Sequence, residues 1–182
     1  TALALLLDGS TGARATAPDS AAVSITGDWD IRARIAPTDW TPAAKQIIVG
    51  KHAASNASIA FSLAASSGGL LQVQWSADGT TDRAEQSTAA TGFTDGSAHW
   101  VRVTVDVNNG AGGTDVKFYT SEDGYTWTQL GATKTTAGTL AVFDGTASLI
   151  IGDWQTASNP LAGLVYAAQV YNGIGGTLVA FM

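Results

Sequence analysis

Several residue types on which enzymes and metal sites depend are missing or scarce in this 182-residue sequence. It contains no cysteine, two histidines and two glutamates, and only 13% of its residues are charged. Without cysteine there is no disulfide, no thiolate metal ligand and no thiol nucleophile. No apolar run approaches the roughly 18 to 20 residues that a membrane-spanning helix needs. These absences exclude thiol chemistry and predict no membrane insertion.

Positive charge is also scarce. Nine lysines and arginines face fifteen acidic residues, which gives a formal net charge of −6. No basic cluster is present to neutralise phosphates, so we expect no nucleic-acid partner and no binding to anionic membranes. At 45% hydrophobic residues the chain is too apolar for a disordered protein. The composition therefore predicts a folded domain with a weakly charged surface.

The length of the chain fits one domain with a full core, which we place at residues 1–182. The sequence starts at Thr1 without an initiator methionine and stops at Met182 in a run with the pattern of a strand. Its opening residues lack the basic segment of a signal peptide. We therefore expect a domain that is part of a longer polypeptide. Processing of the first residue is the alternative explanation for the missing methionine.

The clearest structural pattern lies in residues 98–131. Apolar and polar residues alternate with a period of two, which indicates a strand with one buried face. The glycine- and asparagine-rich segment 108–113 then predicts a tight reversal, and a second alternating run and a second turn follow. This pattern predicts a β-meander. The first run has on its buried side Val101, Val103, Val105 and Val107, and on its other side Trp100, Arg102, Thr104 and Asp106.

The rest of the chain shows the same organisation in shorter pieces. Residues 28–35 alternate strictly, with Trp29 inward and Arg32 and Arg34 outward. We expect about 12 to 14 strands, at the turn spacing of sandwich folds. No segment sustains a helical period over three turns. The sequence thus predicts an all-β protein, a two-sheet antiparallel jelly-roll sandwich.

Three stretches of the sequence resemble laminin-G-like domains. Near the start, Asp8–Gly9 and 18–20 (Pro-Asp-Ser) precede the strand 28–35, where that family has Asp-Gly, Pro-x-Ser and F-T-I-x-A-W. HWVRVTVDV, followed by its hairpin, is similar to W-H-x-V-x-V-T-Y-D. The last stretch, 150–173, is similar to I-G…P-F-x-G-x-I-D-E-V-R-I-Y-N. The resemblance covers nearly the whole chain and implies the concanavalin A-like lectin/glucanase jelly roll.

Two details of the resemblance bear on function. The run 120–131, TSEDGYTWTQLG, looks most like copies found in tail and other virion proteins of bacteriophages. Where the family often has Asp-Glu in the last strand, this chain has Tyr166–Ala167. Because the acidic and amide positions of the family frequently hold calcium, the resemblance does not carry a metal site to this chain. We expect no metal and no cofactor. Calcium is the alternative at the turns 106–110 and 78–82, which fit Asx-turns better than calcium loops.

Catalytic residues are hard to find in the sequence. Glycoside hydrolases of this fold need two carboxylates on one face of a strand, in the pattern E-x-D-x-x-E. Glu85 and Glu122 instead stand apart in turn-like contexts. His52 and His99 allow a Ser-His-Asp triad by composition, but no nucleophile-elbow sequence supports one, and their spacing is not that of a zinc site. We predict that the protein is not an enzyme.

Five aromatic residues are the candidate ligand-binding residues, and all of them except Trp75, which lies in a predicted strand, are in or beside loops. An aromatic ring with polar neighbours suits a sugar, whose C–H face stacks on the ring while its hydroxyls form hydrogen bonds. The same residues could equally cap the core or bury at a subunit contact. The candidates are Trp40, Trp75, Tyr125, Trp127 and Trp154.

Taken together, these observations favour a non-catalytic, lectin-like recognition or adhesion module of a virion tail or capsid-surface protein. Its expected ligand is a glycan of the bacterial surface, and its expected location is the virion surface or the extracellular space. The alternative is a structural or decoration domain that contacts neighbouring virion subunits, further copies of this chain among them, and binds no sugar. A glycoside hydrolase is the third and least favoured function.

Overall fold

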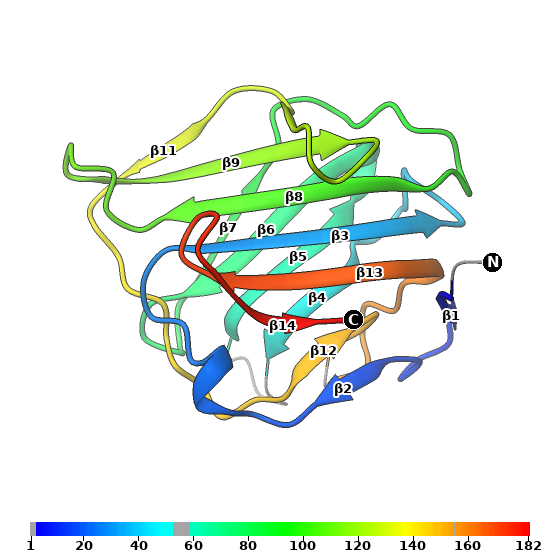
Figure 1. Ribbon diagram of the computed structural model, residues 1–182, viewed down its shortest axis with the longest axis horizontal. Coiled ribbons are helices and arrows are strands. Elements are labelled where there is room, and N and C mark those ends of the chain that lie inside the picture. Colours follow the sequence, from blue (N-terminus) through cyan, green and yellow to red (C-terminus); the bar gives the residue numbers. More distant parts are fainter. Residues whose placement is uncertain (1–2, 53–58, 155) are drawn as a thin grey trace.

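The computed structural model describes residues 3–52, 59–154 and 156–182. It consists of two stacked antiparallel sheets (Figure 1), which confirms the predicted jelly-roll sandwich. The eight-stranded sheet has the order β1 (Leu5–Asp8), β13 (Ala162–Asn172), β3 (Trp29–Pro37), β8 (His99–Asp106), β9 (Gly113–Ser121) and β10 (Thr128–Gln129), with β11 (Lys134–Ala137) also paired to β9 and β14 (Thr177–Phe181) also paired to β13.

The second sheet lies behind the first in Figure 1 and has six strands. Two 3₁₀ turns are the described helical segments, and no helix among them is long and apolar enough to cross a membrane. The six-stranded sheet has the order β2 (Ala15–Ala17), β12 (Leu149–Ile151), β4 (Gln46–His52), β5 (Ile59–Ser66), β6 (Leu70–Ser76) and β7 (Asp82–Gln86); the turns are η1 (Ala21–Val23) and η2 (Ser67–Gly69).

The core fills the space between the two sheets and follows the period-two pattern of the sequence. The predicted meander forms, with β8 paired to β3 on one side and to β9 on the other. Trp29 is fully buried and packs against Phe61 of the facing sheet, with ring centroids 5.4 Å apart. Alternation therefore leaves a second set of side chains on the outer face of each sheet. Those of the eight-stranded sheet form the candidate site below.

Two β-hairpins share the sequence S-x-D-G-x-T and the same hydrogen bonds. In the hairpin 121–126, Asp123 accepts the backbone N–H groups of Tyr125 and Thr126 at 2.8 and 2.7 Å, and Ser121 Oγ accepts the N–H of Gly124 at 2.9 Å. The hairpin 76–81 repeats this arrangement around Asp78. A carboxylate that satisfies two backbone donors fixes the turn, so we assign both motifs a structural role.

These hairpins should make the protein less stable in acid. Backbone N–H donors lower the pKa of Asp78, and those of Thr126 and Tyr125 lower the pKa of Asp123 to about 2. A carboxylate with a depressed folded-state pKa contributes stability above its unfolded pKa of about 3.9, and this contribution is lost as the pH falls towards the folded value. Denaturant titrations between pH 5 and 2 should show this loss. Replacing both aspartates with asparagine should make the free energy of unfolding less dependent on pH in this range. An unchanged pH dependence would contradict the structural role of the two aspartates.

Candidate functional site

The outer face of the eight-stranded sheet presents side chains from β13, β3, β8 and β9 in aligned rows. The strand registers place Ala167, Arg34, Trp100 and Ser121 in one row, Gln169, Arg32, Arg102 and Tyr119 in the next, and Tyr171, Asp30, Thr104 and Lys117 in the third. We call these three rows, together with Trp127 and Tyr166, the aromatic–arginine face. Its aromatic and arginine side chains are all partly exposed.

A fully buried carboxylate anchors this face. Asp30 is 0% exposed and accepts two hydrogen bonds from Arg32, at 3.2 and 2.8 Å, and two from Arg102, at 3.0 and 2.7 Å. The backbone N–H of Gly175 donates a further hydrogen bond of 3.2 Å. Paired two-point contacts of this kind fix guanidinium groups in orientation as well as position. Both arginines are therefore held in place on the sheet.

Aromatic rings pack around the two fixed guanidinium groups. Trp127, which follows the hairpin 121–126, lies over both, with its ring centroid 5.8 Å from Arg32 and 5.5 Å from Arg102. Tyr171 lies 4.3 Å from Arg32 and Tyr119 lies 5.0 Å from Arg102. Such cation–π contacts contribute roughly 0.5–1 kcal/mol each at exposed sites. The result is a preorganised surface of alternating aromatic and guanidinium groups.

The hairpin that carries Trp127 is seated closely on the sheet. Trp100 meets Trp127 edge to face at 6.4 Å. Gly124 has φ +78°, and a Cβ at this position would lie 2.7 Å from the Trp100 ring. Only glycine fits both the left-handed backbone and this close approach. Tyr125, at the tip of the same hairpin, is 88% exposed.

The five aromatic residues singled out from the sequence fall in three different places. Trp127 belongs to the aromatic–arginine face and Tyr125 projects beside it, so these two stay candidates for ligand contact. Trp40 and Trp75 are each 1% exposed and belong to the hydrophobic core. They offer no ring face to a ligand, and the structure corrects that part of the prediction.

Trp154 lies apart from the others, against the six-stranded sheet. Its ring stacks on His52 with centroids 4.4 Å apart, and Lys45 Nζ lies 4.0 Å from its centre. Lys45 also donates a 2.5 Å hydrogen bond to Gln74, which alternates with the core residues of β6. Burial lowers the pKa of His52 and of Lys45. Because the ring already contacts an imidazole and an ammonium group, Trp154 is a weaker candidate for stacking on a ligand.

Sequence reasoning missed most of the aromatic–arginine face. Arg32, Arg34 and Arg102 were placed on the outward side of their strands but were given no role. Tyr119 and Tyr171 occupy outward positions of the same alternating pattern. Arginine and aromatic residues at outward positions of several strands are the feature of the sequence that could have indicated this face. Only the strand order shows that these residues are neighbours.

One cluster resembles a catalytic triad in its distances. His99 Nε2 lies 3.0 Å from Ser97 Oγ, and His99 Nδ1 lies 2.9 Å from a carboxylate oxygen of Glu122. However, the Ser97 hydroxyl donates to the carbonyl of Thr94. The backbone N–H groups of Ser97 and Gly96 are also engaged, with the carbonyls of Thr94 and Pro37. These groups therefore provide no oxyanion hole beside the serine.

A pair of carboxylates also lies on the outer face, at the edge of the three rows. Asp106 and Asp115 are directly opposite each other on β8 and β9. Hydrogen bonds from Asn109 and Thr135 hold the pKa of Asp115 below its usual value, whereas the general acid of a glycosidase needs a raised pKa. Within the described ranges no group of three histidine, aspartate or glutamate residues is arranged to hold a metal ion.

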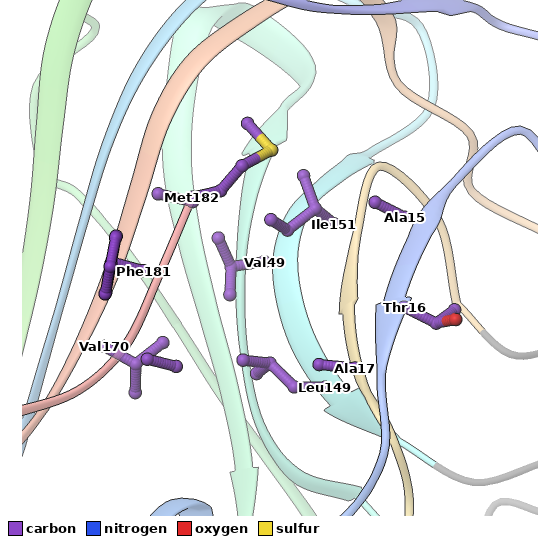
Figure 2. Close-up of a pocket in the computed structure, with 11 residues that line it drawn as sticks. Ala15, Thr16, Ala17, Val49, Leu149, Ile151, Val170, Phe181 and Met182 are labelled. Carbon is purple, nitrogen blue, oxygen red and sulfur yellow. The ribbon is translucent and has the colours of Figure 1, made fainter.

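An apolar cavity of about 200 Å³ opens between the two sheets at the edge formed by β2, β12 and β14. Figure 2 shows side chains from both sheets around it, with Val49, Leu149 and Ile151 on one side and Val170 and Phe181 on the other. The cavity is smaller than the roughly 300–1,000 Å³ of typical ligand sites and almost without polar groups. It is not a site for a glycan.

Comparisons with known proteins place the fold. No protein-family model and no curated protein matches the sequence. Among solved structures, the IT-sialidase CBM40 of Ruminococcus gnavus bound to alpha2,3 sialyllactose superposes with a TM-score of 0.63 at 14% identity, over 88% of this chain and 91% of that one.

Two further structures agree with this result. A heptameric SAP-like pentraxin from Limulus polyphemus gives a TM-score of 0.58 at 14% identity, over 92% of this chain and 75% of that one. Domains LG4-5 of the mouse laminin alpha1 chain give a TM-score of 0.59 at 14% identity, over 93% of this chain and 41% of that one. The strand order and these likenesses together show that the chain has the concanavalin A-like jelly-roll fold, as its resemblance to laminin-G-like domains predicted.

Proposed function

We propose that this protein is a non-catalytic glycan-binding module and that the aromatic–arginine face is its binding surface. The observation that carries the proposal is Trp127, held across Arg32 and Arg102 and flanked by Tyr119 and Tyr171. Partly exposed rings offer faces for the C–H groups of a sugar, and the guanidinium groups beside them offer hydrogen-bond donors for its hydroxyls. Because Asp30 already fixes the two arginines, binding would order few further side chains.

Two further observations support this function. The Ruminococcus gnavus module with the same fold was solved with sialyllactose bound. The clusters that come closest to catalytic machinery lack what catalysis needs: the serine of the triad-like cluster has no oxyanion hole beside it, and Asp115 has a lowered pKa. A binding role therefore fits the described residues better than a hydrolytic one.

The setting that we propose is the surface of a bacteriophage virion, with a bacterial envelope polysaccharide as the partner. The resemblance of the run 120–131 to phage virion proteins supports it. In the structure this run forms the hairpin that presents Tyr125 and Trp127. The motif behind the resemblance thus also builds part of the proposed surface.

A second candidate function is contact with neighbouring subunits. It is favoured by exposed apolar side chains on β1 and β14, which both pair with β13 at the edge of the eight-stranded sheet. Phe181 of β14 also lines the cavity of Figure 2. Leu6 is 71% exposed, Leu178 is 42% and Phe181 is 80%. Apolar exposure gathered at one edge is typical of interaction surfaces. In this alternative the chain is a structural domain that binds no sugar.

A glycan array separates the two candidates. We expect wild-type protein to bind one or more bacterial surface polysaccharides. Trp127→Ala should weaken this binding at least about tenfold, because it removes the central stacking surface. Trp154→Ala is the matched control, an aromatic truncation against the other sheet, and should leave the affinity nearly unchanged.

Thermal unfolding of each variant shows whether it is folded. Glycan binding that survives Trp127→Ala but is lost in Trp154→Ala would move the site to the six-stranded sheet. If the wild-type protein binds no glycan and associates with itself in sedimentation experiments, the subunit-contact function replaces the proposed one.

A further inference from the structure

We propose that the aromatic–arginine face selects saccharides that carry a carboxylate, and that Arg34 is the residue that binds this group. The inference rests on the proposed function, because it names the class of glycan that the same surface takes. It depends on the different surroundings of the three arginines on the face.

Two of these arginines share a carboxylate partner inside the protein and the third does not. Arg32 and Arg102 both pair with Asp30, at 2.8 and 2.7 Å. Arg34 lies over the ring of Tyr166, with 4.9 Å between the guanidinium carbon and the ring centroid. Within 3–52, 59–154 and 156–182, no carboxylate and no hydrogen-bond acceptor contacts the guanidinium group of Arg34. Its guanidinium group therefore keeps its donors for a ligand.

The neighbours of Arg34 in its row carry no charge. The register places Ala167 of β13 directly opposite Arg34 on one side and Trp100 of β8 on the other. Neither side chain can pair with the guanidinium group as a counter-ion. A ligand carboxylate at this point would meet the planar fork of the guanidinium group, which binds carboxylates in a two-point geometry. The rest of its sugar ring would lie beside Trp100 and Tyr166.

The charge of the face also favours an anionic ligand. Its three rows contain four cations, Arg32, Arg34, Arg102 and Lys117, and a single carboxylate, Asp30, while Asp106 and Asp115 lie beyond the third row, at the end away from Arg34. The whole chain has a net charge of −6, so this positive surface stands out against an acidic protein. A positive patch attracts anionic ligands and disfavours cationic ones. An uncharged saccharide could only accept hydrogen bonds from this guanidinium group through its hydroxyls, without the charge pairing that a carboxylate adds.

The test compares acidic bacterial polysaccharides with their carboxyl-reduced derivatives, which differ only in the charged group. We expect wild-type protein to bind the acidic form at least about tenfold more tightly, as for a charge-assisted two-point contact. Higher salt should weaken this preference. Arg34→Met keeps the aliphatic stem and should abolish the preference. Ala167→Glu places a carboxylate opposite Arg34. It should also abolish the preference, because the new carboxylate would pair with the guanidinium group in place of the ligand.

Lys117→Met is the matched control, because it removes the same charge from the third row and should leave most of the preference intact. If Lys117→Met and Arg34→Met reduce the preference for the acidic form equally, Arg34 is not the residue that binds the carboxylate. If wild-type protein binds both forms equally, the proposed selectivity is wrong while the glycan-binding function stands. If it binds neither form, nor any neutral glycan, both proposals fail. A merely structural role for Arg34 would change the unfolding temperature and leave the acidic-to-reduced affinity ratio as it is.

Discussion

Replacing Asp30 with alanine should lower the free energy of unfolding by about 3–5 kcal/mol, which is the usual cost of removing one partner from a buried ion pair. The carboxylate is fully buried and accepts hydrogen bonds from two arginines. Without it, Arg32 and Arg102 would face each other across β3 and β8 as two like charges, with side chains only 18% and 13% exposed. Denaturant unfolding of the two proteins measures the loss.

The same substitution should also release the aromatic rings that depend on the fixed guanidinium groups. We therefore expect glycan binding to fall together with stability, even at temperatures where the variant is folded. Asp30→Asn keeps the shape of the side chain and one acceptor oxygen, but its NH2 group is a donor and cannot accept from an arginine. It should fall between wild type and Asp30→Ala in stability. An alanine variant within about 1 kcal/mol of wild type would contradict the anchoring role, because that is the size of an ordinary surface effect.

A second large effect is expected at Lys51, whose side chain is 0% exposed and belongs to β4. Its ammonium group pairs with Asp19 at 2.9 Å and with Asp144 at 3.3 Å, and so connects β4 to the segment before η1 and to the loop before β12. Replacing both aspartates with asparagine leaves a buried ammonium group without a carboxylate. We expect a loss of about 3 kcal/mol, at the lower end of the range for buried pairs because the carboxylates are partly exposed.

Lys51→Met should cost much less, below about 1.5 kcal/mol, because it replaces the buried charge by an apolar side chain of similar volume. The diagnostic result is a smaller loss in the free energy of unfolding when the lysine is replaced than when its two aspartate partners are replaced. Equilibrium denaturation of the methionine variant and of the double aspartate variant measures it. Equal losses would mean that Lys51 contributes mainly through packing, and that its charge adds little.

Much of the sandwich is predictable from the sequence because side chains alternate between the two faces of a strand, so the local pattern shows which of them share a face. Trp29 and Trp100, placed on opposite faces of their strands by the period of two, are found there: Trp29 is fully buried and Trp100 lies on the outer face. Trp75 alternates with Leu71 and Val73. That pattern already favoured a core position over the ligand-binding role that we gave it.

Trp40 shows where local reasoning stops. It lies in a segment with loop-like sequence, yet its backbone N–H donates to Asp95 at 2.7 Å and its indole N–H donates to the carbonyl of Ser97 at 3.0 Å. Both partners lie more than fifty residues away. No periodicity in the sequence reports such a contact, so a tryptophan in a loop could not be separated from a buried one before the structure was known.

The sequence by itself determined the all-β class, the positions of the main turns and the two-sided character of each strand, since all of these depend on residues close together in the chain. Only the tertiary structure decided which outward residues become neighbours. Asp30 and Arg102 are 72 residues apart in the sequence, and Lys51 and Asp144 are 93 apart, yet each pair is in contact. The order of strands in a sheet follows from how the whole core closes and not from any one strand. The aromatic–arginine face, with Arg34 over the ring of Tyr166, therefore exists only once β13, β3, β8 and β9 lie side by side.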